Sequence, residues 1–253
     1  MSRLRLVTLN TWKNEGHYTS RVAAMAQQLA ALDADVIALQ ECFACEAKGD
    51  DTAAVLAEAT GLCLTRAPMR RKPRAHHGQT LLSSSGLALL TRQAPLVSRL
   101  VALPEDPRDG QRLAIVADVL AAPGGLLRVA TTHLTHLRDD EANRVRALQA
   151  QTLLAAAREG LFSPVVIMGD LNDPPDAPAL ASLFGDSELD RASAPAPVAA
   201  QDRLRLGAID HVLVYGAADV WQVERRWLCV TAPCADGGAP SDHPGVCLDL
   251  VAV

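Results

Sequence analysis

Residues 35–41 read DVIALQE, and this stretch decides the fold. Four consecutive apolar residues predict a strand over residues 35–40 that is buried on both faces and ends at the carboxylate of Glu41. Residues 165–172, VVIMGDLN, have the same form: a buried strand is predicted over 165–168, and Asp170 and Asn172 follow it. Because a buried carboxylate needs a hydrogen-bonding partner or a metal ion, such strand ends are candidates for a functional site.

The segments around these two strands repeat one order: strand, helix, strand. In the first quarter, residues 3–10 alternate as a strand that ends in Asn10, and residues 20–32 have helical periodicity with Ser20 as the N-cap. In the second half, residues 141–159 predict a long helix. Further strands are predicted over residues 87–91, 113–119, 127–132, 209–215 and 246–251. This pattern favours an α/β fold in which two similar strand-rich halves pack face to face.

The composition is that of a globular protein. Of the 253 residues, 49% are hydrophobic and 21% are charged, and no linker or low-complexity segment divides the chain, so we expect one domain over residues 1–253. The formal net charge of −5 excludes a protein-wide basic field for nucleic acid, although residues 66–74 form a basic segment. We expect this segment to be a solvent-exposed loop, and contact with substrate phosphates is the alternative.

Nothing in the sequence indicates export or a membrane span. No run of residues is long and apolar enough to cross a bilayer, and residues 1–10 lack the features of a secretion signal. The six cysteines are too sparse for a disulfide scaffold, and Cys42 and Cys45 lack the second pair of a zinc knuckle. We therefore expect a cytoplasmic protein with reduced, mostly buried thiols.

Polar residues able to do chemistry stand at the ends of the predicted core strands. The candidates are Asn10, Glu41, His133, Asp170, Asn172, Asp210, Asp242 and His243. If the strands lie side by side, their ends converge and place these side chains around one cleft. Their oxygen atoms suit Mg²⁺ or Mn²⁺, which keep part of their water shell and bind substrate phosphates. Taken alone, residues 242–244 are more typical of a turn, and Gly169-Asp170 is compatible with a turn that ends a strand, so the hypothesis depends on the whole set.

The remaining histidines have structural interpretations. His133 and His136 have the spacing of a zinc pair, but at a strand end this spacing does not put both imidazoles on one face. His211 follows Asp210 within a predicted strand, so its side chain should point to the opposite face, and we expect a structural role. His76 and His77 lie beside the basic segment and are expected to be exposed.

Six short motifs occur in an order that resembles one family. They are LVTLNTW at residues 6–12, DVIALQE at 35–41, TTHLTH at 131–136, MGDLN at 168–172, IDHVLV at 209–214 and SDHPGV at 241–246. Together they resemble the endonuclease/exonuclease/phosphatase superfamily, the group of deoxyribonuclease I and the neutral sphingomyelinases. The resemblance covers nearly the whole chain. It implies a four-layer α/β sandwich, in which two mixed β-sheets pack face to face with helices outside.

The resemblance also implies which residues bind metal and activate water. Glu41 resembles the principal metal-binding carboxylate of the family, and Asn10 and Asp242 stand where residues lie beside that metal. Asp170 resembles the residue that orients or deprotonates the attacking water. Asn172 resembles the amide that steadies the phosphorus centre. The implied cofactor is Mg²⁺ or Mn²⁺.

The imidazoles complete the implied site. His133 and His243 resemble the two histidines that flank the scissile phosphate, and Asp210 stands in the place of a carboxylate that orients one of them. Arg112 matches only loosely an arginine of the family that contacts phosphate. Thr132 departs from the family pattern, where Asn is common, so one supporting hydrogen bond is expected to differ.

These residues predict a Mg²⁺- or Mn²⁺-dependent phosphoester hydrolase. The leading hypothesis is a nuclease-like phosphodiesterase in which Asp170 activates a metal-assisted water while His133 and His243 bind at the phosphate. A phosphomonoesterase or a phospholipase C-type esterase of small or lipid phosphates is the alternative. An inactive binding protein on the same fold is the third reading. The expected partner is a phosphoester, with nucleic acid as one candidate, and no protein partner is predicted.

Overall fold

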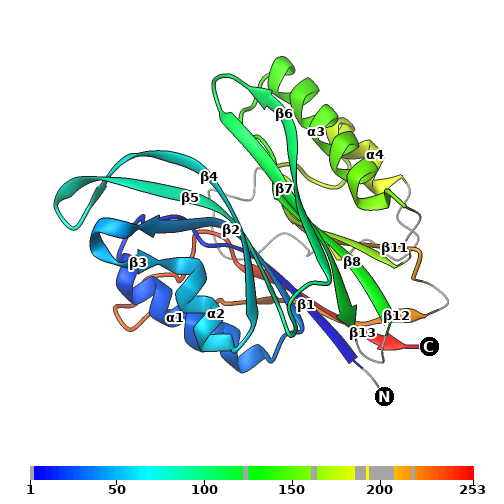
Figure 1. The fold of residues 1–253 in the computed structure, drawn as a ribbon, viewed down its shortest axis with the longest axis horizontal. Helices are drawn as coiled ribbons and strands as arrows, with labels where there is room; N and C mark the ends of the chain where they lie inside the picture. Colours follow the sequence, from blue (N-terminus) through cyan, green and yellow to red (C-terminus); the bar gives the residue numbers. More distant parts are fainter. Residues whose placement is uncertain (1–2, 122–124, 161–163, 186–191, 194–207, 218–219) are drawn as a thin grey trace.

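Two mixed β-sheets pack face to face, and helices cover the outer face of each sheet (Figure 1). The computed structural model describes residues 3–121, 125–160, 164–185, 192–193, 208–217 and 220–253. Helices α1 (Tyr18–Leu32) and α2 (Thr52–Thr60) cover the first sheet, and α3 (Asp140–Arg158) and α4 (Ala181–Phe184) cover the second. The four-layer α/β sandwich implied by the resemblance is therefore confirmed.

The first sheet has the strand order β12-β13-β1-β2-β5-β4, with the short strand β3 beside β2. Its strands are β1 (Arg3–Asn10), β2 (Val36–Cys45), β3 (Asp50–Asp51), β4 (Cys63–His76), β5 (Gln79–Thr91), β12 (Trp221–Cys229) and β13 (Gly245–Ala252). Strands β1 and β2 are parallel, and the other pairs are antiparallel. The sheet thus joins the first quarter of the chain to its last segment.

The second sheet has the strand order β10-β11-β9-β8-β7-β6. Its strands are β6 (Val97–Asp106), β7 (Gly110–Ala121), β8 (Gly125–His133), β9 (Val165–Asp170), β10 (Ala192–Ser193) and β11 (Asp210–Tyr215). Only β8 and β9 run parallel among these strands, and α3 connects them. The predicted strand, helix, strand order of both halves is confirmed.

Alternating side chains of the central strands fill three separate apolar cores. In β1, Leu4 and Leu6 face the second sheet, whereas Val7 and Leu9 face the layer of α1 and α2. A third core lies between the second sheet and α3 with α4, and it contains Ile167 of β9. Because the central strands are covered on both faces, their sequences are almost continuously apolar.

The helix ends differ from the sequence prediction in detail. Helix α1 begins at Tyr18, and His17, not Ser20, occupies its N-cap. Helix α2 was not predicted, although Asp51 caps its start by accepting a hydrogen bond from a backbone N–H, and Gly61 ends it with a positive φ of 67°. Among the helices in the described ranges, none is both long and apolar enough to span a bilayer.

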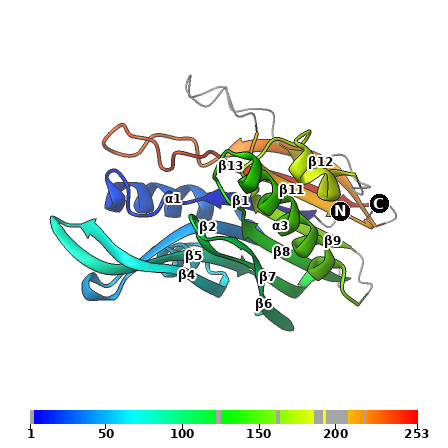
Figure 2. The same cartoon turned by 90° about the horizontal axis from the view of Figure 1, so that it is seen from above.

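The basic residues 66–74 belong to strand β4, so the prediction of a loop was wrong. Strand β4 pairs with β5 along its length and forms a long hairpin, whose tip lies at the opposite end of the molecule from the two termini (Figures 1 and 2). β4 is an edge strand, where Pro68 and Pro73 are tolerated because one side of the strand needs no N–H donors. The expectation for His76 was also wrong, because it is buried, whereas His77 is exposed.

Strand register gathers the predicted polar residues at one end of the sandwich. In the second sheet, Asp170 of β9 lies opposite both His133 of β8 and Asp210 of β11. In the first sheet, Asn10 of β1 lies opposite Gln40 of β2. Gln40 and the neighbouring Glu41 lie within β2, which continues to Cys45, so the prediction that this strand ends at Glu41 was wrong. Because the sheets face each other, these residues and the ends of β1, β8 and β9 border one space.

Gly169 lets strand β9 approach β8 directly beside Asp170. Its φ is 148°, and an added Cβ would lie 2.2 Å from the carbonyl oxygen of Thr132. We expect Gly169→Ala to lower the free energy of unfolding by about 3 kcal/mol, because it adds a backbone clash to a strained conformation. Urea unfolding measures this change. In the control Gly125→Ala, no described atom apart from those of its chain neighbours lies within 4 Å of the new Cβ, and the change should stay within about 0.5 kcal/mol. Equal stability of both variants would contradict this close approach.

Candidate active site

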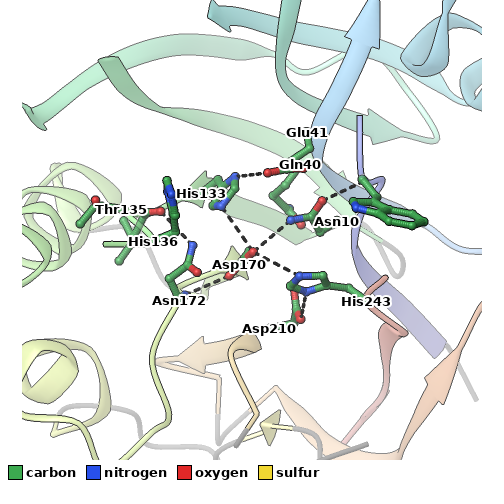
Figure 3. A network of polar contacts seen from close by, with 12 residues as sticks. Asn10, Gln40, Glu41, His133, Thr135, His136, Asp170, Asn172, Asp210 and His243 are labelled. Atoms are coloured by element: carbon green, nitrogen blue, oxygen red, sulfur yellow. Dashed lines mark hydrogen bonds and ion pairs between the residues drawn. The ribbon is translucent and has the colours of Figure 1, made fainter. Parts of the chain in front are cut away.

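Asp170 is the point at which side chains from both sheets meet (Figure 3). Its Oδ2 accepts a hydrogen bond of 3.0 Å from Nδ2 of Asn10 and lies 3.4 Å from Nε2 of His133. Its Oδ1 accepts a hydrogen bond of 3.0 Å from the backbone N–H of Asn172. Burial and the nearby negative charge of Asp210 raise the pKa of Asp170 to about 7. The carboxylate is therefore held in one orientation and can exchange a proton near neutral pH.

His243 and Asp210 form an imidazole–carboxylate pair beside Asp170. Nδ1 of His243 lies 2.7 Å from Oδ2 of Asp210, whereas Nε2 lies 4.0 Å from Oδ2 of Asp170 and 3.9 Å from Oδ1 of Asp242. The hydroxyl of Ser241 accepts a hydrogen bond from the backbone N–H of His243. Asp210 thus fixes the ring so that Nε2 is directed toward Asp170 (Figure 3).

A bulge in strand β2 places Glu41 in the same cleft. The pairing of β2 with β5 shifts between Leu39 and Cys42, and Glu41 has a φ of 56°. Oε1 of Glu41 lies 2.8 Å from Nζ of Lys13 and 3.9 Å from Nδ1 of His133. Lys13 was not among the predicted site residues. Of the two groups, its ammonium lies nearer to the carboxylate of Glu41.

The cleft has a volume of about 340 Å³. It is lined by the predicted residues Asn10, Glu41, Arg112, His133, Asp170, Asn172, Asp242 and His243. Asp210 is not one of these lining residues, but it contacts the lining residue His243. Four lining residues have positive φ angles: Trp12 (57°), Lys13 (45°), Glu41 (56°) and Asn172 (56°). Such conformations are uncommon outside glycine and cluster at functional sites, which supports a functional role for this cleft.

Asn172 and Arg112 are held in place by the strand ends. Nδ2 of Asn172 donates to the carbonyl oxygen of Leu134 at 3.0 Å. Arg112 is buried, and its guanidinium donates to Oδ2 of Asp109 at 2.6 Å and to the carbonyl oxygen of His133 at 3.3 Å. Arg112 therefore reaches the cleft, and its contact with the carbonyl oxygen of His133 steadies the end of β8.

The two imidazoles stand in opposite electrostatic environments. Burial, together with the positive charges of Arg112 and Lys13, lowers the pKa of His133 well below its usual value. Burial also disfavours the charged form of His243, but the charge and hydrogen bond of Asp210 outweigh it and raise the pKa of His243 to about 10. At neutral pH, His133 is therefore neutral and His243 is protonated.

Two buried arginines hold the loops at the rim of the cleft, and the sequence prediction missed both. The guanidinium of Arg21 in α1 donates to the carbonyl oxygens of Thr11, Trp12, Lys13, Glu15 and Pro240. Arg146 in α3 donates to the carbonyl oxygens of Thr135 and Leu137 and to the side chains of Asn143 and Asp173. One signal existed in the sequence, because Arg21 stands four residues before the buried Met25 and thus on the apolar face of its helix.

The other histidines lie outside the cleft or at its edge. His211 is fully buried, and its Nε2 lies 2.8 Å from the carbonyl oxygen of Asp173, as expected for a structural residue that points away from the site. The ring of His136 is more than half exposed, and Nδ1 lies 3.2 Å from Oδ1 of Asp109. His133 and His136 thus contact different carboxylates.

A sequence profile of the Endonuclease/Exonuclease/phosphatase family matches residues 7–243. The chain belongs to this family. Its members are hydrolases that act on phosphoesters, which fits a cleft of carboxylate, amide and imidazole groups. A search of curated protein sequences finds no match.

Solved structures of other proteins share this family fold. The human Nocturnin catalytic domain with bound sulfate is 18% identical, with a TM-score of 0.74 over 99% of this chain and 95% of that chain. TDP2 from D. rerio, complexed with a single-strand DNA product, is 17% identical, with a TM-score of 0.67 over 99% of this chain and 100% of that chain. A mannosyl-6-phosphatase from Bacteroides thetaiotaomicron is 17% identical, with a TM-score of 0.64 over 98% of this chain and 99% of that chain.

The charge of Asp210 controls the protonation of His243 in this endonuclease/exonuclease/phosphatase fold. We expect Asp210→Asn to lower the pKa of His243 from about 10 toward the usual 6.5, because the raising charge is removed while burial remains. An NMR pH titration of the imidazole resonances in chelator-treated protein measures the change. The control is Asp236→Asn, which removes the surface carboxylate that pairs with His17 and should leave the His243 titration as in the wild type. An unaltered His243 titration in Asp210→Asn would contradict the assigned pair.

Proposed function

We propose that this protein is a divalent-metal-dependent phosphoesterase, and specifically a phosphodiesterase in which Asp170 activates the attacking water. The observation that carries the proposal is the pair formed by Asp210 and His243, with Nε2 of His243 4.0 Å from the Asp170 carboxylate. An oriented base and a protonated imidazole in one cleft can supply the proton transfers of phosphoester hydrolysis. Membership of a family of phosphoester hydrolases supports the same conclusion.

The chain's own groups divide the work by their protonation states. Asp170, with its pKa raised to about 7, can accept a proton from a water in the cleft. His243, with its pKa raised to about 10, can donate from Nε2 to the leaving oxygen or bind the phosphate as a cation. His133 is neutral and can hydrogen-bond to a nonbridging oxygen. Asn172 lies beside Asp170 and can hold the phosphoryl group through its amide.

The residues present fit a hard divalent cation at the Glu41 side of the cleft. The ammonium of Lys13 lies 2.8 Å from Oε1 of Glu41, so a positive charge is already accommodated at this carboxylate. Asn10, Glu41 and Asp242 would hold the ion through oxygen atoms. Asp170, Asp210 and His243 also have ligand atoms within 4.8 Å of one another, but the protonated imidazole makes this group better suited to proton transfer. A bound Mg²⁺ or Mn²⁺ would offset negative charge on the phosphate oxygens.

Activity should depend on the metal and on Glu41. Hydrolysis of bis(p-nitrophenyl) phosphate is expected to stop with EDTA and to return with Mg²⁺ or Mn²⁺. Glu41→Gln should lower kcat/KM by about 100-fold or more, because a neutral amide holds a divalent cation weakly. The matched control is Glu46→Gln, on an exposed glutamate outside the cleft. Full activity in EDTA would contradict the metal mechanism, and an inactive parent across all phosphoesters would favour the binding-protein reading.

A nucleic-acid phosphodiester as substrate is supported by Arg70 on β4. Arg70 lines the cleft and is partly exposed, with Nη1 3.4 Å from Oδ1 of Asp109. Arg74 follows on the same strand, but its guanidinium is bound to Ser83 and Ser85 inside the hairpin. Arg70 is therefore the residue of the basic segment best placed to bind a substrate phosphate. The fold shared with TDP2, which was solved with a single-strand DNA product, is consistent with this substrate class.

An ester with an apolar group is the second candidate, and a neighbouring cavity favours it. This cavity has a volume of about 590 Å³ and shares Trp12, Asp242 and His243 with the catalytic cleft. Its further lining includes Leu228 and Val230. A lipid-type or aryl phosphoester could place its phosphate in the cleft and its apolar part in this cavity.

Two variants distinguish these substrates. If nucleic acid is the substrate, Arg70→Ala should raise KM for single-stranded DNA about tenfold and leave bis(p-nitrophenyl) phosphate hydrolysis nearly unchanged, because a charge-assisted phosphate contact is lost. If an apolar ester is the substrate, Leu228→Gln should instead raise KM for sphingomyelin or an aryl phosphodiester. Arg71→Ala is the control, since Arg71 points to the opposite face of the strand. Equal effects of Arg70→Ala and Arg71→Ala would contradict a specific phosphate contact.

A further inference from the structure

The tip of the β4–β5 hairpin carries a second cluster of metal-ligand side chains outside the catalytic cleft. Asp50 of β3, His76 at the end of β4 and His77 in the turn each offer one ligand atom, and these atoms lie within 4.8 Å of one another. We propose that Asp50, His76 and His77 form a zinc site that joins the hairpin to the segment after β2. The site is independent of the proposed hydrolysis.

The two imidazoles converge on one carboxylate oxygen. Nε2 of His76 lies 2.7 Å from Oδ2 of Asp50, and Nε2 of His77 lies 3.5 Å from the same atom. Ligand atoms in a tetrahedral zinc site stand roughly 3.3 Å apart, since zinc–nitrogen bonds are about 2.0 Å long. If the distance between His76 and Asp50 increased from 2.7 Å to about 3.3 Å, one zinc ion could take the place of their hydrogen bond.

The surroundings orient the ligands and leave a path for entry. The ring of His76 is buried against Phe43 and Tyr18, with ring centroids 4.7 Å and 5.3 Å away. His77 is about half exposed and borders a cavity of about 530 Å³ that reaches His17. Within the part of the chain that the structure describes, no residue lines both this cavity and the catalytic cleft. A fourth ligand position can therefore be filled by water from the cavity.

The donor set selects a transition metal over Mg²⁺. Two imidazoles and one carboxylate are the ligands that Zn²⁺ takes in three-residue sites, whereas Mg²⁺ prefers oxygen ligands alone. A hydrogen bond between Asp50 and His76 alone would not explain why the imidazole of His77 also lies beside this carboxylate. The ring centroids of His76 and His77 are nevertheless only 4.1 Å apart, which brings a second nitrogen to the same carboxylate.

The turn offers a variant that removes a ligand without disturbing the hairpin. His77 and Gly78 both have positive φ angles, 48° and 72°, as in a two-residue type I′ turn. Asn-Gly is the preferred sequence for that turn, so His77→Asn should keep the hairpin folded. We expect chelator-treated wild-type protein, titrated with ZnCl₂ in excess Mg²⁺ by calorimetry, to bind one more zinc than His77→Asn. Zinc should also raise the Tm of the wild type more than that of the variant.

His17→Ala is the matched control, because His17 borders the same cavity but pairs with Asp236. It should bind zinc as the wild type does. Asp50→Asn should weaken binding at this site by about 100-fold or more, since it removes a charged ligand. Equal zinc stoichiometry in wild type and His77→Asn would overturn the proposal. A loss in His17→Ala as large as that in His77→Asn would also overturn it, because the donors would then be different.

Discussion

The buried carboxylate of Asp170 is the constraint on which the site and the packing of the two sheets both depend. A charged group in this position is costly unless each oxygen has a partner, and the partners come from both sheets. Asn10 is the last residue of β1 in the first sheet, whereas His133 is the last residue of β8 in the second. A shift of one sheet against the other would remove the contact with Asn10, whereas His133 would stay beside Asp170 in the second sheet. The hydrogen bond from Asn10 therefore links the alignment of the two sheets to the orientation of this carboxylate.

Arginine side chains hold the loops that follow the strand ends by donating hydrogen bonds to their backbone carbonyl oxygens. Carbonyl groups near the rim have no strand partners, and buried carbonyls must be hydrogen-bonded. Arg21 satisfies a group of them on the first-sheet side, and Arg146 satisfies another on the second-sheet side. Each arginine belongs to a helix outside its sheet, so helix packing also sets the position of the rim. Desolvation by burial lowers the pKa of both guanidinium groups, although both remain charged at neutral pH.

The sequence predicted the central strands and missed most edge strands for one physical reason. Central strands such as β2 and β9 are buried on both faces, so their apolar runs are continuous and end abruptly at residues of the candidate site. Strands β4, β6 and β12 lie at sheet edges and carry charged side chains or proline, which resemble loop sequence. The strand-end candidates were found in the same way, because they interrupt apolar runs. Lys13 and Ser241 lie in loops and could not be found by that pattern.

His133 and His243 differ in protonation state, and this difference could not be predicted from the sequence. His133 follows an apolar segment and His243 precedes one, and both lie near Asp170, so the sequence alone does not distinguish their electrostatic environments. Register separates them, because β11 pairs with β9 so that Asp210 lies beside Asp170, within reach of Nδ1 of His243. His133 instead lies near the cations of Arg112 and Lys13. The chain thus places a cationic and a neutral imidazole around one carboxylate, and the distinction arises from strand pairing and not from the histidines themselves.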